Sequence, residues 1–166
     1  MKNFLISIGI AALVMGVFMM LRSSPESVPA TPISNNLEVR GKQLRTAIDQ
    51  AYKRMSDAQT IRGRWVNITS VVVPYIPAGM SFDDAEQVLR SAGFEVKPRP
   101  GPKGLKDHTD PYKYNVEALI KNYTNPYLNW LSSPFGVSIA VDLTPKAPRD
   151  YTKVLRVEAS ILVSDI

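Results

Sequence analysis

The side chains best suited to acid/base chemistry lie together in one short stretch of the chain. Asp107, His108 and Asp110 fall within four residues. A carboxylate beside a histidine can orient the imidazole ring and shift its pKa, which suits the histidine to general acid or base catalysis. His108 is the only histidine of the 166 residues and there is no cysteine. The composition therefore excludes multi-histidine metal sites, thiolate zinc sites, cysteine nucleophiles and disulfides.

The residues around His108 argue against catalysis. Residues 98–111 read PRPGPKGLKDHTDP, with four prolines and two glycines in 14 residues. Such a segment forms an irregular loop, whereas catalytic groups need rigid support. We therefore predict that the protein is not an enzyme and has no cofactor. A small hydrolase that uses His108 with Asp107 or Asp110 is the alternative.

A second pair of carboxylates, Asp83 and Asp84, follows Ser81 at the start of a helical pattern. Serine is a good N-cap residue, and a carboxylate three residues later can complete a capping box. Acidic side chains also favour the positive end of a helix dipole. We interpret this pair as structural.

Basic side chains are concentrated in residues 40–64, where seven Lys and Arg residues face only two acidic ones. Such a patch attracts anionic lipid headgroups, anionic polymers or nucleic acid, although a solvated helix face is the more common meaning of such charges. The candidate binding residues are Arg40, Arg45, Lys53, Arg54, Arg62 and Arg64.

The chain begins with an apolar run, Phe4 to Leu21, which contains no charged residue, Asn, Gln or Pro in 18 positions. As a helix it would span about 27 Å, close to the hydrocarbon thickness of about 30 Å. A cleaved signal peptide is the alternative, but its apolar core is usually about 7 to 15 residues long. We therefore predict a transmembrane anchor in contact with the lipid bilayer.

The residues that flank this run predict the topology. The amino terminus and Lys2 precede it and Arg22 follows it, a weak bias that places the amino terminus in the cytoplasm. Residues 23–36 are rich in Ser and Pro and predict a flexible linker. The sequence thus predicts a single-pass inner-membrane protein with a periplasmic domain formed by residues 37–166. The part of the chain from residue 23 onward carries a net charge of +3.

The domain begins with an amphipathic pattern. From Leu37 to Met55, apolar residues recur at steps of three and four, which predicts a helix capped by Asn35 or Asn36. Residues 65–73, WVNITSVVV, are rich in β-branched types and predict a strand that ends before Pro74.

Residues 74–96 form the most informative stretch. Ser81 begins a helix, Gly93 ends it, and Phe94 to Val96 form a short strand. The pattern Gly79-Met80-Ser81, Asp84-Ala85, Leu89 and Ala92-Gly93-Phe94-x-Val96 resembles the first half of a PASTA repeat, an extracytoplasmic module associated with peptidoglycan and β-lactam recognition. The same outline is similar to small envelope assembly lipoproteins of the BamE (SmpA/OmlA) type. Either resemblance implies an envelope protein, but neither assigns a ligand residue.

The remaining segments alternate apolar and polar residues. This alternation predicts strands at residues 112–120, 136–144 and 153–163, the last two joined as a hairpin. They would form an antiparallel sheet with one polar face and one face covered by the two helices. The predicted fold class is α+β, a two-layer domain with about two helices on a mainly antiparallel sheet.

Together these features predict a membrane-anchored cell-envelope protein whose domain binds another envelope protein or a wall polymer. A cytoplasmic nucleic-acid-binding domain on a reversed anchor is a further alternative that the predicted export topology disfavours.

Overall fold

A computed structural model of the protein describes residues 32–58, 65–100, 113–126 and 136–164. The apolar run at 4–21, the acid/base candidates at 107–110, and Arg62 and Arg64 lie outside these ranges. None of the helices within them is both long and apolar enough to cross a membrane. Residues 33–166 belong to one structural unit.

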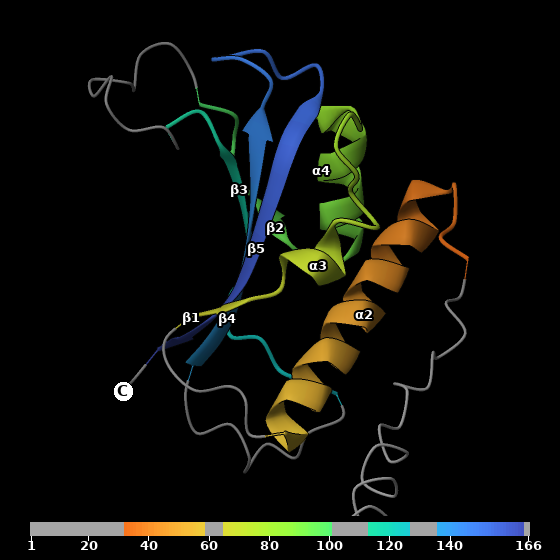
Figure 1. The fold of residues 1–166 in the computed structure, drawn as a ribbon, viewed down its shortest axis with the longest axis vertical. Helices are drawn as coiled ribbons and strands as arrows, with labels where there is room; N and C mark the ends of the chain where they lie inside the picture. The colour runs from red at the N-terminus through yellow and green to blue at the C-terminus, as the bar shows by residue number, and fades with distance from the viewer. Residues whose placement is uncertain (1–31, 59–64, 101–112, 127–135, 165–166) are drawn as a thin grey trace, which may run out of the picture. The chain divides into compact units, whose positions relative to one another are not determined.

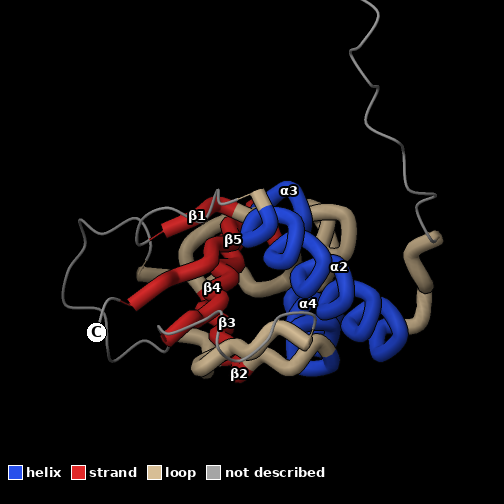
Figure 2. Tube along the Cα trace, turned by 90° about the horizontal axis from the view of Figure 1, so that it is seen from below, coloured by secondary structure: helices blue, strands red, loops and turns tan. Residues whose placement is uncertain are grey.

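The described part of this unit has two layers (Figures 1 and 2). One layer is a five-stranded antiparallel sheet in the order β1-β5-β4-β3-β2. The helices lie on one face of this sheet, so the predicted α+β class is confirmed. The elements, in chain order, are α2 (Leu37–Asp57), β1 (Trp65–Asn67), α3 (Thr69–Val72), α4 (Phe82–Ser91), β2 (Glu95–Val96), β3 (Val116–Ile120), β4 (Gly136–Pro145) and β5 (Val154–Ser164).

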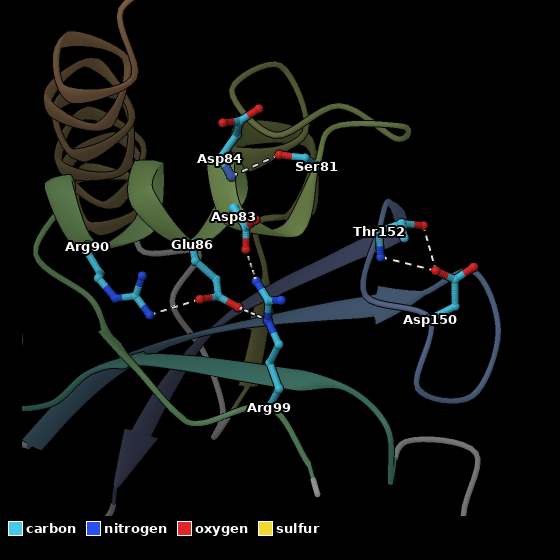
Figure 3. Close-up of polar contacts among 8 residues, drawn as sticks. All are labelled: Ser81, Asp83, Asp84, Glu86, Arg90, Arg99, Asp150 and Thr152. Atoms are coloured by element: carbon cyan, nitrogen blue, oxygen red, sulfur yellow. Dashed lines mark hydrogen bonds and ion pairs between the residues drawn. The ribbon is translucent and has the colours of Figure 1, made fainter.

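The two longer helices begin and end where local signals predict. Asn36 caps α2, because its side-chain oxygen accepts hydrogen bonds from the backbone N–H groups of Glu38 and Val39. In α4 the Ser81 hydroxyl accepts a bond from the Asp84 N–H, but the Asp84 carboxylate points away from Ser81 (Figure 3), so the capping box is only half formed.

The end of α4 is a Schellman motif. The N–H of Phe94 donates to the carbonyl of Leu89, and the N–H of Gly93 donates to that of Arg90. Gly93 has a φ of 91°, a conformation that glycine adopts without a steric penalty. The chain then enters β2 at once, as the sequence predicted.

The strand predicted for residues 65–73 is wrong beyond Asn67. The Asn67 side-chain oxygen accepts a hydrogen bond from the Thr69 N–H, which turns the chain out of the sheet and into α3. The Thr69 hydroxyl accepts a bond from the Ala159 N–H. Val72 and Ile76 are then fully buried beyond the end of the strand. A tertiary contact with β5 and burial of the apolar run thus outweigh its β propensity.

The other predicted strands are largely confirmed. The hairpin of β4 and β5 matches the prediction, but β3 begins at Val116, because residues 113 and 114 form a turn. Edge strands β1 and β2 extend the predicted three-stranded sheet to five. Alternate residues of the central strands face the helices and form the core with Leu44, Ile48 and Phe82.

Candidate functional site

The basic residues that were predicted to form one patch on α2 lie apart in the structure. At about 100° per residue, Arg40 and Arg45 lie about 140° apart around the helix, on opposite sides of its buried stripe. Arg40 donates a hydrogen bond to the Ser34 carbonyl, and Lys53 forms an ion pair with Asp57. Arg54 is exposed on the same helix. These side chains do not form one contiguous surface.

Arg45 takes part in a buried cluster that joins α2 to the segment after β3. Its Nε donates to the Asp49 carboxylate at 3.0 Å, and its guanidinium lies 5.1 Å from the centre of the Tyr123 ring. The Tyr123 hydroxyl donates to the same carboxylate at 2.6 Å. Asn125 donates to the Asp49 backbone carbonyl and to the Tyr123 hydroxyl. The cluster therefore has a structural use, holding the end of β3 against the helix.

Replacing Tyr123 by phenylalanine is expected to destabilise the fold by about 1–3 kcal/mol, because the buried Asp49 carboxylate loses a donor. Burial, followed by the hydrogen bond to Asp49 and its charge, raises the pKa of Tyr123 above the ordinary value of 10.0. The neutral phenol therefore stabilises the fold fully below pH 10.0, and this contribution is lost as the pH rises further.

Denaturant titrations at pH 8 and pH 11 test this prediction. At pH 11 the advantage of the native protein over Tyr123→Phe should fall by roughly 1.4 kcal/mol, since about one pH unit separates pH 11 from the ordinary pKa. Tyr75→Phe, outside the cluster, serves as the control. An equal stability difference at both pH values would contradict the assignment.

A second charged cluster surrounds Arg99, in the segment that follows β2 (Figure 3). Its Nε binds the Glu86 carboxylate at 2.6 Å, and a terminal nitrogen binds Asp83. Glu86 also pairs with Arg90. The guanidinium lies 5.7 Å from the ring centres of both Phe82 and Tyr151. Asp83 thus pairs with Arg99, a contact that the sequence did not predict.

The face of the sheet opposite the helices has no described helix over it (Figure 2). We call it the open face, although Ala140 and Ser160 in its central part are only 6% and 8% exposed. Strand register places its side chains in rows that cross neighbouring strands. The rows, from one end of the sheet to the other, are Glu117–Asp142–Glu158, Glu95–Leu119–Ala140–Ser160–Asn67, and Ser138–Leu162–Trp65.

The first row places three carboxylates side by side on β3, β4 and β5. Two of them have a cationic neighbour: Lys97 pairs with Glu117, and Arg156 pairs with Glu158 at 3.3 Å. Asp142, between them, forms no ion pair within the described residues. Burial and the charges of Glu117 and Glu158 raise the pKa of Asp142, because each disfavours its ionised form.

Carboxylates opposite one another on neighbouring strands destabilise a sheet. Because the pKa of Asp142 is raised in the folded protein, the protonated carboxyl stabilises the fold. This stabilisation is complete below the ordinary pKa of 3.8 and is lost as the pH rises through the folded-state pKa. At neutral pH the charged side chain therefore lowers the stability of the domain. Such a carboxylate is compatible with a binding surface, since stability is often exchanged for function.

The opposite end of the open face is apolar. Trp65 is 69% exposed and lies directly across from Leu162, which is 36% exposed. A scattered exposed apolar residue is normal, but two that are adjacent on a sheet form a small patch. Aromatic residues are enriched at the centres of protein interfaces.

No known protein family, curated protein or solved structure matches this chain.

The role of the open face is consequently inferred from its geometry alone. Within the described ranges, no three His, Cys, Asp or Glu side chains are placed to hold one metal ion, so the carboxylate row is not arranged as a metal site. The face offers negative charge at one end and an aromatic surface at the other. These properties suit binding rather than bond-making chemistry.

Sequence reasoning predicted that one face of the sheet is polar but did not single out Asp142 or Trp65. The alternation along each strand assigns a residue to a face, but only the register between strands shows which side chains are neighbours. An acidic residue within each of the three strands, at Glu117, Asp142 and Glu158, was the available signal.

Proposed function

We propose that this chain is a membrane-anchored cell-envelope protein whose α+β domain binds a partner through the open face of its sheet and catalyses no reaction. The observation that carries the proposal is the exposure of Trp65 beside Leu162, on a face with no described helix over it. The anchor rests on the apolar run from Phe4 to Leu21, and the periplasmic placement on its flanking charges.

Two further features support a binding role. The Asp49 carboxylate accepts a hydrogen bond from Tyr123, and the Glu86 carboxylate pairs with Arg99, so both hold elements of the domain together. The charged side chain of Asp142, in contrast, lowers stability where it stands, so a partner that compensates its charge would explain its presence. The resemblance of residues 74–96 to PASTA and BamE-type modules stays a prediction.

Photo-crosslinking in intact membranes tests the proposal. With benzoylphenylalanine in place of Trp65 of the full-length protein, illumination is expected to give one discrete adduct, because the side chain is exposed on the proposed interface. The matched control places the same group at Val39, which is 43% exposed on α2. No adduct from position 65, or equal adducts from both positions, would overturn the binding role.

Two companion measurements address the anchor and the alternatives. We expect the full-length protein to stay in the membrane during carbonate extraction, and alkaline phosphatase fused at its carboxyl end to be active. Release by carbonate or an inactive fusion would overturn the anchor or its orientation. The His108→Ala variant tests the hydrolase alternative. That alternative predicts that the variant loses its function, whereas our proposal predicts that the variant still forms the adduct at position 65 in unchanged yield.

A further inference from the structure

We propose that the open face binds a segment of a partner protein that presents a lysine or arginine to Asp142 and an apolar side chain to Trp65 and Leu162. This inference rests on the binding function proposed above and specifies the chemistry of the partner.

The negative charge of the row Glu117–Asp142–Glu158 favours binding of a cation. Glu117 and Glu158 each have a basic neighbour within the domain, and Asp142 between them forms no ion pair in the described part of the chain. Lys97 and Arg156 thus bring two positive charges to a row of three carboxylates, and the charge of Lys97 only partly offsets that of Asp142. An incoming cation would interact favourably with Asp142 and relieve its repulsion from both neighbours. Anionic partners such as nucleic acid, phosphate-rich wall polymers and anionic lipid headgroups would be repelled at this row.

The apolar end of the face adds a second requirement. Leu162 and Trp65 lie in the row of Ser138, which is four residues along β4 from Asp142. At about 3.4 Å per residue, the two rows are about 14 Å apart along the strand. A partner segment must therefore carry its cation and its apolar side chain at least about 14 Å apart, which corresponds to about four or more residues of extended chain. A simple cation satisfies only half of this surface, whereas a polypeptide can satisfy both ends.

The position-65 crosslinker provides the test when it is combined with changes of charge in the full-length protein. Asp142→Asn is expected to lower the yield of the adduct about tenfold, equivalent to the loss of roughly 1.4 kcal/mol of binding free energy. Asp142→Lys should lower it further, because it adds repulsion. The control, Asp57→Lys, makes the same change in net charge on the exposed end of α2 and should change the yield less than about twofold.

A defined probe separates the cation from the apolar group. A synthetic peptide with a lysine and a leucine four residues apart should compete with formation of the adduct, whereas the same peptide with glutamate in place of lysine should not. Asp142→Asn must also be shown to be folded. Its melting temperature should be no lower than that of the native protein, since the charged carboxylate is disfavoured in the fold.

The outcomes distinguish the two proposals. An adduct at position 65 that does not respond to Asp142→Asn or Asp142→Lys would overturn the cationic partner but leave the binding function standing. An adduct with lipid, glycan or nucleic acid instead of a polypeptide would also overturn this inference. Supporting outcomes are dependence on Asp142, competition by the lysine peptide, and a crosslinked peptide that contains a basic residue near an apolar one.

Discussion

Replacing Phe82 by alanine is expected to destabilise the domain by about 3–5 kcal/mol, the largest loss we predict for a single substitution. Phe82 is fully buried at the first position of α4, and its ring meets that of Tyr151 edge-on at 5.2 Å. Its removal leaves a cavity beneath the helix and takes away one of the two rings on which the Arg99 guanidinium rests. A typical domain is stable by only about 5–15 kcal/mol, so the loss is a large share of the total.

Denaturant unfolding of the full-length protein measures this effect. Phe82→Leu is the matched variant, because it keeps most of the apolar volume, and it should lose less than half as much stability. The alanine variant should also weaken the Arg99 cluster, so an additional Arg99→Ala change should cost less in Phe82→Ala than in the native protein. A loss below about 1 kcal/mol for Phe82→Ala would show that this ring is not the core residue described here.

The second large effect concerns Gly41, where α2 crosses α4. A β-carbon at this position would lie 2.4 Å from the Ser91 β-carbon and 2.6 Å from the Val88 carbonyl oxygen. The carbonyl belongs to the helix backbone, so the clash can be relieved only if the two helices move apart. Gly41→Ala is therefore expected to destabilise the domain by about 1–3 kcal/mol, the usual cost of overpacking.

The sign of this effect is the decisive observation. In an exposed helix, replacing glycine by alanine stabilises by about 1 kcal/mol, so intrinsic propensity predicts the opposite result. Thr46→Ala, on the exposed side of α2, is the control and should be neutral or slightly stabilising. If thermal unfolding shows that Gly41→Ala raises the melting temperature, the close packing of α2 against α4 at Gly41 is contradicted.

The helices illustrate what could be predicted without a structure. Asn36, Ser81 and Gly93 act on backbone groups within a few residues of themselves, so their effects can be recognised from sequence order alone. The apolar stripe of α2 and the alternation of β4 and β5 likewise depend only on helical and strand periodicity. These elements were predicted with bounds that differ from the structure by about two residues.

The errors arose where a distant contact decided the conformation. Residues 68–73 have the composition of a strand, yet the Thr69 hydroxyl bonds to the backbone of Ala159, 90 residues away, and the segment becomes α3. The ion pairs of Arg99 with Asp83 and Glu86 could not be predicted for the same reason, since they join residues separated by 16 and 13 positions, respectively.

The sequence by itself determined the two longer helices, the central hairpin, the α+β class and the side chains that belong to each face of the sheet. Only the tertiary structure decided that Glu117, Asp142 and Glu158 are neighbours, that Trp65 lies across from Leu162, and that Arg40 and Arg45 lie apart. The physical reason is that periodicity is a property of each segment, whereas register and packing depend on which segments meet. The proposed binding surface is made by strand register, so it became visible only in the folded sheet.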